Sequence, residues 1–570
     1  MTSKTACVVG AGASGLAALK ECLHQGFKTV CYELDADVGG IWHKKDYSRP
    51  TNTPAVWDNL TMNSSKFNSC YSDLPPQFED TPYLSAEGMY RYFKKAVQHF
   101  GLESYIHFNT RVVKIRKTSD HDTTGRWEVF TAKRGDDIAG DDLAGPRGDD
   151  LSLSRCHREV FDFVFVCTGY FKVPRYPDIH GMDTFIGTIQ HSFNYSSPKP
   201  YDGKTVLVVG NFVSAIDIAN DIANVAKRVY LALGEGTWIL PKCYAKARTL
   251  DLLFSRAFVY QRNALAKMNE VMIKLANARI DHESASIRPS KPPTLSALGT
   301  NDDIQLKILV GKVQTYGRLT ALQQDQALFL DGKVVSGIDA VMFCTGYAPD
   351  LSFLDLPIIE DNGKMELYRM ALPLKEKHNS LALIGQFAGD GPLAICFELQ
   401  ARLATRVMAG KHKLPPPDLM KNEADFWNAQ TLARRGGYDS YLVNTVLLTE
   451  LLALELGCYP TFWKILLKDP VLAFRIWYGP MFASQYRLLG PDSQWQEAAQ
   501  VCHAFYEEGH SSLRHREVSK LLRPDLYGYT KTRLIIFSSV AAIIGFVAYI
   551  QRVLPKIILP QPLAQLLSFQ

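Results

Sequence analysis

The chain lacks the sequence features typical of secreted, metal-binding and nucleic-acid-binding proteins. Its eleven cysteines include no Cys-x-x-Cys pair and no cluster with histidine at the spacing of a zinc site. Because their number is odd and Cys7, Cys31, Cys167 and Cys344 stand in apolar runs, we expect reduced thiols in a cytosolic protein, and no metal site. The 63 basic and 58 acidic side chains form no long basic run, so nucleic acid is not an expected partner. The first apolar run, Thr5–Val9, is too short for a secretory signal peptide.

Length and composition indicate a globular protein with more than one domain. The chain has 570 residues, of which 46% are hydrophobic and 21% charged. A single hydrophobic core does not grow to that size, so we expect two or three domains.

A long uncharged run lies near the end of the chain. Leu534–Ile550 has seventeen residues without a charge and basic residues on both sides. A helix needs about 20 apolar residues to cross the hydrocarbon layer, with a range of about 17–25, and a flanking arginine can snorkel to lengthen it. We therefore expect a single transmembrane anchor over residues 531–553 and a tail over 554–570. A buried core helix is the alternative.

The N-terminal segment has the pattern of a β-α-β unit. Thr5–Val9 is typical of a short buried strand, and Gly10-Ala11-Gly12-Ala13-Ser14-Gly15 leads from it into a helical stretch that runs to about His24. A second strand, Thr29–Glu33, ends in an acidic residue. In such a GxGxxG turn the first glycine makes the bend, the second lets the backbone approach a pyrophosphate, and the third allows close helix–strand packing. The helix start offers N–H groups to phosphates, and the acid can accept hydrogen bonds from ribose hydroxyls. The pattern predicts a dinucleotide site.

A Gly-Gly turn follows the acidic residue. Gly39-Gly40-Ile41-Trp42 favours FAD over NAD at this site, because in flavoproteins with two dinucleotides such a turn passes near the flavin side of the cofactor.

A second unit of the same kind begins about 200 residues later. A strand Lys204–Val209 precedes Gly210, and a helical stretch Ser214–Ala226 and a strand Arg228–Leu233 follow. Another pair of segments is also duplicated. Each is a buried strand that ends in Cys-Thr-Gly-Tyr, and the two are Phe163–Tyr170 and Val341–Tyr347. The duplication predicts two Rossmann-like domains.

The segment between these units carries a family pattern. Phe185–Tyr195 (FIGTIQHSFNY) fits FxGxxxHxxx(Y/F), the identifying motif of the flavin-containing monooxygenase family. The resemblance to that family, and to its animal microsomal members, extends along essentially the whole chain. Further similar segments are Asn63–Lys66, Cys70–Asp73, Glu398–Arg402, Asp469-Pro470 with Tyr478–Pro480, and Gln485–Leu488 with Gly490-Pro491.

The resemblance implies a mechanism in which NADPH reduces FAD and O2 adds to flavin C4a. The hydroperoxide then oxygenates a soft nitrogen or sulfur atom of a small molecule, and the protein must orient the flavin and exclude water. By position, Asn63 is the implied catalytic residue, because a neutral amide donates and accepts hydrogen bonds without shuttling a proton. A turn-forming asparagine is the alternative. For His191 we expect a structural or cofactor-positioning role.

The candidate cofactor-binding residues come from both units. They are Gly10, Ala11, Gly12, Ala13, Ser14, Gly15, Glu33, Gly40, Ile41, Trp42, Asn63, Ser64, Gly210, Val213, Ser214 and Ala215.

The second unit departs from the family pattern GxGxSG. Phe212 replaces its second glycine and Val213 replaces a usual asparagine. The family often has a Ser-Thr-Arg run that could pair with the 2′-phosphate of NADPH, whereas Ala232–Trp238 contains Glu235 and no arginine. NADPH is therefore expected mainly from the resemblance, and NADH is possible.

Together these observations predict an α/β fold in which an FAD domain is interrupted by a nicotinamide domain. The expected boundaries are 1–195 and 330–440 for the FAD domain, 196–329 for the nicotinamide domain, and 441–530 for a helical cap. The anchor would place the protein in the endoplasmic reticulum membrane with its catalytic domains facing the cytosol. Baeyer–Villiger oxidation, amino-acid N-hydroxylation, and a poorly coupled membrane flavoprotein with a scaffold or oxidase role remain alternatives.

Overall fold

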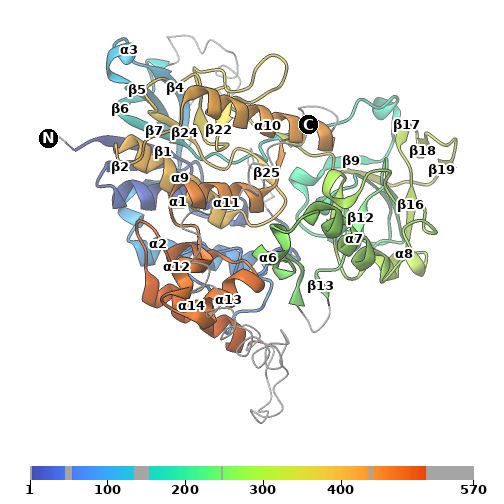
Figure 1. Cartoon of the computed structure of the whole chain (residues 1–570). Coiled ribbons are helices and arrows are strands. Elements are labelled where there is room, and N and C mark those ends of the chain that lie inside the picture. The colour runs from blue at the N-terminus through green and yellow to red at the C-terminus, as the bar shows by residue number, and fades with distance from the viewer. Residues whose placement is uncertain are drawn as a thin grey trace.

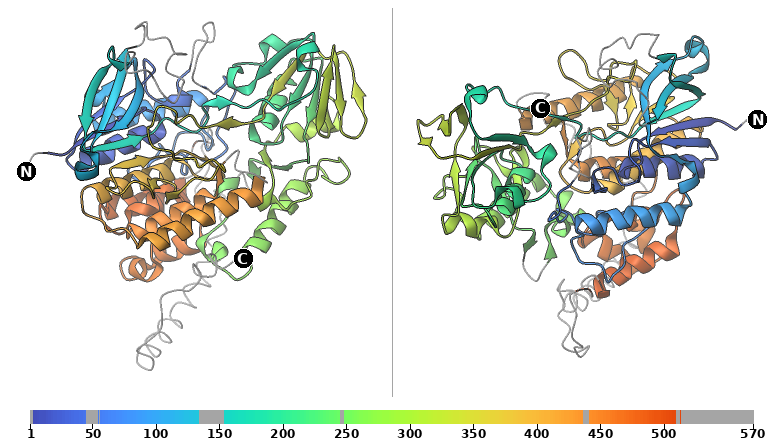
Figure 2. Two further views of the ribbon diagram at one scale, coloured as in Figure 1. Left: turned by 90° about the horizontal axis from the view of Figure 1, so that it is seen from above. Right: turned by 180° about the vertical axis from the view of Figure 1, so that it is seen from behind.

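The computed structural model describes residues 3–44, 54, 56–133, 153–244, 248–435, 441–508 and 512. Two α/β lobes lie side by side in all three views (Figures 1 and 2). The first contains the blue N-terminal and orange segments, and the second contains the green middle of the chain. The green segment therefore lies in the sequence between the two segments of the first lobe.

The first lobe is built on a five-stranded parallel sheet. Its strands in spatial order are β24 (Leu381–Leu383), β7 (Phe163–Val166), β1 (Thr5–Val9), β2 (Lys28–Tyr32) and β3 (Ile106–His107). The predicted β-α-β unit is confirmed, because helix α1 (Ala13–His24) connects β1 to β2 and these strands pair in parallel. Helix α1 packs on β1, β2 and β7 of the sheet and also contacts α9 (Ala394–Met408).

The second lobe repeats this plan. The strands of its five-stranded parallel sheet are β16 (Val313–Tyr316), β11 (Arg228–Ala232), β10 (Thr205–Val209), β20 (Ala340–Phe343) and β9 (Thr188–His191). Helix α5 (Val213–Ile222) connects β10 to β11 as α1 connects β1 to β2. Strand β20 lies beside β10 as β7 lies beside β1, which explains the duplicated Cys-Thr-Gly-Tyr ends.

Each lobe also carries a small antiparallel sheet, which the chain forms between β3 and β7 in the first lobe and between β16 and β20 in the second. In the first lobe it consists of β4 (Thr110–Lys117), β5 (Trp127–Lys133) and β6 (His157–Phe161). In the second lobe it consists of β17 (Leu319–Gln323), β18 (Gln326–Phe329) and β19 (Val334–Val335). The duplication therefore extends beyond the strands that the sequence pattern identified.

The second sheet extends beyond the residues expected for the second domain. Strands β9 and β20 lie outside the interval 196–329, yet both belong to this sheet. Because β9 precedes β10 in the chain and fills the edge position beyond β20, the family-pattern segment Phe185–Tyr195 crosses from the first lobe into the second.

Short helices after the first lobe form a third layer at the bottom of Figure 1. They are α12 (Phe462–Leu466), α13 (Pro470–Tyr478) and α14 (Trp495–Glu508), whereas α11 (Thr445–Glu455), which precedes them in the chain, packs against α9. The first residues of the region that was expected to be helical, Leu442–Val443, form strand β26 against β25 (Ala388–Gly389).

The expected anchor over 531–553 lies outside the described residues. Among the helices that the structure does describe, none is both long and apolar enough to cross a bilayer. All eleven cysteines are described, and each is a free thiol.

Candidate functional site

The first glycine turn is shaped by backbone contacts at two of its three glycines. Gly10 has φ of +100°, and a Cβ there would lie 2.7 Å from the carbonyl oxygen of Cys167. A Cβ at Gly15 would lie 1.8 Å from the carbonyl oxygen of Gly10. A Cβ at Gly12 would lie 3.5 Å from Gly40 Cα, an ordinary van der Waals distance. The fold therefore requires Gly10 and Gly15, whereas the bare backbone at Gly12 suits the approach of a ligand.

The residues around this turn prepare it for a dinucleotide. Gly12 is the N-cap of α1 and offers no side chain to the first helical turn, which begins with Ala13 and Ser14. The N–H groups of that turn are thus left for a ligand or solvent. Glu33 is buried at the end of β2, where its carboxylate accepts hydrogen bonds from the N–H groups of Ala11 (2.5 Å) and Asp35 (2.8 Å).

The Gly-Gly turn lies against the same place. Gly39 and Gly40 have φ of +104° and +56°, and the Gly39 N–H donates to the carbonyl of Ala11 at 3.0 Å. Ile41 and Trp42 continue from it in a short 3₁₀ helix, Gly40–Trp42. The predicted residues 10–15, 33 and 40–42 are therefore brought together at the carboxyl edge of the first sheet.

The Asn63 segment lies between the lobes. Lys242 Nζ from the second lobe donates to Thr61 Oγ1 at 2.8 Å and to the Thr61 carbonyl at 3.1 Å. Ser65 donates through both its N–H (2.9 Å) and its Oγ (2.8 Å) to the buried carboxylate of Asp251. Ser64 forms a 2.8 Å hydrogen bond with Ser69 within the same turn. These contacts hold the turn around Asn63 against the second lobe.

Asn63 itself is next to a buried carboxyl group. Burial raises the pKa of Asp217 on α5, while Lys242, Asn301 and the Asn63 amide act in the opposite direction. Asn63 Oδ1 is buried and has no hydrogen-bond partner in the described part of the chain. Gln386 Oε1, just after β24, is in the same condition. With the glycine turns above, two such orphaned polar atoms fit residues that bind a flavin dinucleotide.

The second glycine turn differs from the first. Gly210 has φ of +148°, and a Cβ there would lie 2.5 Å from the carbonyl oxygen of Cys344, so this glycine is required. Phe212 is the N-cap of α5 with φ of −113° and ψ of −178°, which is extended backbone open to any residue. Val213 and Ser214 begin the helix, and the fully buried Ala215 carries the Cβ that Gly15 cannot.

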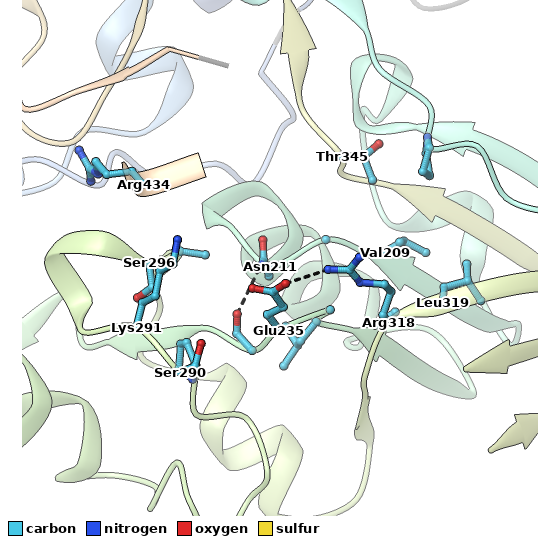
Figure 3. A pocket seen from close by; sticks show the side chains of 18 of the residues that line it. Val209, Asn211, Glu235, Ser290, Lys291, Ser296, Arg318, Leu319, Thr345 and Arg434 are labelled. Atoms are coloured by element: carbon cyan, nitrogen blue, oxygen red, sulfur yellow. Dashed lines mark hydrogen bonds and ion pairs between the residues drawn. The ribbon is translucent and has the colours of Figure 1, made fainter. Parts of the chain in front are cut away.

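A cavity of about 520 Å³ lies at the carboxyl edge of the second sheet, beside Gly210 and Asn211 (Figure 3). Phe212 is not among the described residues that line it. Glu235 lines the cavity, and Arg318 Nη2 donates to Glu235 Oε1 at 2.9 Å. An arginine from the turn after β16 therefore lies beside Glu235, although Ala232–Trp238 contains none.

His191 lies in the core of this region. Its Nδ1 accepts a hydrogen bond from the Phe193 N–H at 3.1 Å, and its ring contacts those of Tyr176 and Tyr347. Burial lowers the pKa of His191 to about 4, so the imidazole is neutral near pH 7. A structural or cofactor-positioning role for this neutral ring stays a prediction.

Three of the family-like segments, those with Asp73, Glu398 and Arg487, meet in a buried ion network. Arg487 Nη2 lies 2.7 Å from Glu398 Oε1 and 2.6 Å from Asp73 Oδ2, and Lys20 Nζ lies 2.8 Å from Asp73. Burial raises the pKa of Glu398, but Lys20, Arg487 and Arg402 outweigh that effect and lower it to about 2. Glu21, Asp73 and Glu398 are close enough to share a cation, and here the side chains of Lys20 and Arg487 fill that role.

A second buried ion pair joins the lobes to the C-terminal helices. Arg256 of the second lobe makes two hydrogen bonds to Glu450 on α11, at 3.1 and 3.0 Å. The hydroxyls of Tyr260 and Tyr486 donate to the same carboxylate. The second lobe is therefore bound to α11 through a charged pair without solvent exposure.

Comparison with known proteins identifies the family. The family described as flavin-binding monooxygenase-like matches residues 3–550. The chain therefore belongs to this family. Dimethylaniline monooxygenase [N-oxide-forming] 2 of Rattus norvegicus is 32% identical over 504 residues, which cover 87% of this chain and 90% of the relative. Flavin-containing monooxygenase 5 of Cavia porcellus is 30% identical over 530 residues, which cover 91% and 95%.

Solved structures show the same fold at low identity. S-allyl-L-cysteine S-oxygenase from Allium sativum aligns with a TM-score of 0.58 at 20% identity and covers 88% of this chain and 99% of its own. A cyclohexanone-bound cyclohexanone monooxygenase aligns with a TM-score of 0.56 at 15% identity and covers 79% and 97%. Membership of the family makes the chain an oxidoreductase and implies a flavin and a nicotinamide cofactor.

Some site residues escaped the sequence analysis. No motif marks Asp217 beside Asn63, Arg318 in the cavity wall, or Gln386 with its buried, unpartnered oxygen. Arg318 follows β16, and it lies beside Glu235 because β16 pairs with β11, which the sequence alone does not show.

Proposed function

We propose that the protein is an FAD- and NAD(P)H-dependent monooxygenase that N- or S-oxygenates soft nucleophilic small molecules. The observation that carries this proposal is the first glycine turn, where Gly10 and Gly15 are fixed by backbone contacts and Gly12 is left bare. A bound flavin would supply the redox and oxygen chemistry.

The chain's own residues have distinct tasks in this proposal. The turn and the start of α1 would bind the pyrophosphate, with Glu33 at the adenosine ribose. The second turn and its adjoining cavity would bind the nicotinamide dinucleotide. Asn63, between the lobes, would present its amide to the reacting part of the flavin and limit the access of water.

A substitution at Asn63 tests its role. Asn63→Asp places a second carboxyl group beside Asp217 and removes the amide donor, so we expect retained FAD and diversion of turnover to H2O2. Asn68→Asp, in the same segment but bound to Asp251, is the matched control for adding a charge. Unchanged yield of oxygenated product per NADPH in Asn63→Asp would contradict the assignment.

The type of substrate is tested with purified protein. A thioether, a tertiary amine and a ketone should be compared for substrate-dependent NADPH consumption and product. We expect sulfoxide and N-oxide formation. Oxygenation of the ketone alone would replace this proposal with Baeyer–Villiger oxidation.

We also propose that the protein resides in the endoplasmic reticulum membrane with both lobes on the cytosolic side. The uncharged run Leu534–Ile550 is the main support. The α12–α13 region adds to it, because Trp463 (55% exposed), Leu467 (89%) and Tyr478 (56%) place apolar side chains at the surface. Tryptophan and tyrosine are enriched at membrane interfaces, which suits this surface to contact with lipid.

A further inference from the structure

Two side chains of opposite charge, Glu235 and Arg318, line the cavity of the second lobe and pair with each other. In Rossmann-like domains, an acidic residue after the second strand accepts a hydrogen bond from a ribose 2′-hydroxyl, whereas a nearby arginine accommodates a 2′-phosphate. Glu235 follows β11, and its carboxylate lies 2.9 Å from the guanidinium of Arg318. An acidic residue and an arginine of these two kinds are therefore present in one cavity.

Sheet register places this pair. Strands β11 and β16 are parallel neighbours in which Ala232 pairs with Tyr316, and Arg318 is two residues beyond that end. Glu235 is three residues beyond Ala232, so both side chains emerge at the carboxyl edge, where dinucleotides bind. Figure 3 shows them pointing toward each other beside Asn211.

The other basic side chains that line the cavity, Lys291 and Arg434, bind partners that do not line it. Lys291 Nζ donates to the carbonyl of Ala433 at 3.0 Å, and Arg434 Nη2 lies 2.5 Å from Asp390. The Arg318–Glu235 pair is different, because its side chains are 58% and 69% exposed. Such an exposed pair is weak, so a doubly charged phosphate can take its guanidinium.

We propose that Arg318 and Glu235 together set the choice between NADPH and NADH, an inference that rests on the proposed function. Arg318 binds the 2′-phosphate of NADPH, and Glu235 binds the 2′-hydroxyl of NADH. Each opposes the other's ligand, because Glu235 repels the phosphate and Arg318 draws the carboxylate away from the hydroxyl. Wild-type protein therefore discriminates weakly between the two cofactors.

The test is calorimetric titration of the FAD-loaded protein with adenosine 2′,5′-bisphosphate and with 5′-AMP, which differ only by the 2′-phosphate. Arg318→Ala should weaken binding of the bisphosphate by roughly tenfold or more, and it should strengthen 5′-AMP binding slightly because it releases Glu235 for the 2′-hydroxyl. Glu235→Gln should strengthen binding of the bisphosphate. The gap between wild type and Arg318→Ala should narrow as salt is raised.

Arg288→Ala is the matched control, because Arg288 is an exposed arginine that pairs with Glu283 and does not line the cavity. An equal loss of bisphosphate affinity in Arg288→Ala and Arg318→Ala, or an unchanged affinity ratio in Arg318→Ala, would overturn the inference. If neither ligand binds the wild type, the nicotinamide part of the proposed function fails as well. Flavin binding is tested separately, by the absorption spectrum of the protein.

Discussion

Replacement of Arg487 by methionine removes the central cation of the buried ion network and keeps much of the side-chain volume. The guanidinium lies 2.7 Å from Glu398 and 2.6 Å from Asp73, and its Nε donates to Ser72 Oγ at 2.8 Å. Glu398 is fully buried, so the substitution leaves a carboxylate with less compensation and no access to water. Breaking a buried ion pair from one side costs about 3–5 kcal/mol, and we expect a loss of that size in the free energy of unfolding.

The assay is urea unfolding monitored by tryptophan fluorescence, with Lys421→Met as the control. Lys421 pairs with Asp425 on an exposed helix face, where such a contact contributes about 0–1 kcal/mol. The pH dependence adds a second criterion. The Glu398 pKa is lowered to about 2 in the wild type, so this carboxylate contributes stability above its unfolded pKa of about 4.3, and the contribution is lost as pH falls toward 2. The deficit of Arg487→Met should therefore shrink as the pH falls through that window. A deficit no larger than that of Lys421→Met, or one that does not change with pH, would refute the reasoning.

Three further predictions address the glycine turn, the buried histidine and the membrane. Gly15→Ala should prevent soluble folding, because its Cβ would lie 1.8 Å from the Gly10 carbonyl oxygen. Gly12→Ala should fold but lose flavin. Full flavin content in Gly12→Ala, measured by absorbance, would contradict the assignment of this turn to the pyrophosphate. The pKa of His191 is lowered to about 4, whereas the unfolded value is about 6.5, so the free energy of unfolding of the wild type should fall by about 1.4 kcal/mol per pH unit as the pH drops between these values. His191→Gln should remove this pH dependence. An identical pH profile in the two proteins would count against the prediction. Truncation before Lys531 should convert tight membrane binding to weak, peripheral binding through the α12–α13 surface, and truncated protein that stays in the membrane pellet after a high-salt wash would show that Leu534–Ile550 is not the principal anchor.

Local pattern was sufficient to predict much of the first lobe. Thr5–Val9 forms β1 with the predicted bounds, because a short apolar run before a glycine turn has few alternatives to a buried parallel strand. The second β-α-β unit was found in the same way. The small antiparallel sheets and the place of β9 were not, since strand order is set by pairing between segments far apart in the chain.

The site followed the same division. The sequence identified Gly10, Gly15 and Gly210, because a position without room for a Cβ has to be glycine and a glycine motif can be recognised in the sequence. Arg318 was not, because its function depends on the neighbouring strand rather than on adjacent residues. The Glu398–Arg487 contact joins two segments that the family resemblance had marked, but only the fold reveals that they bind each other.

The most direct test of the central claim is a single-substrate balance with the purified, FAD-loaded protein. NADPH consumed, H2O2 released and sulfoxide formed from a thioether are measured together under isotopically labelled O2. We predict a sulfoxide that carries one oxygen atom from O2. Its amount should equal the NADPH consumed minus the H2O2 released. NADPH oxidation that ends entirely in H2O2, with no labelled product from the thioether or from a tertiary amine, would contradict it.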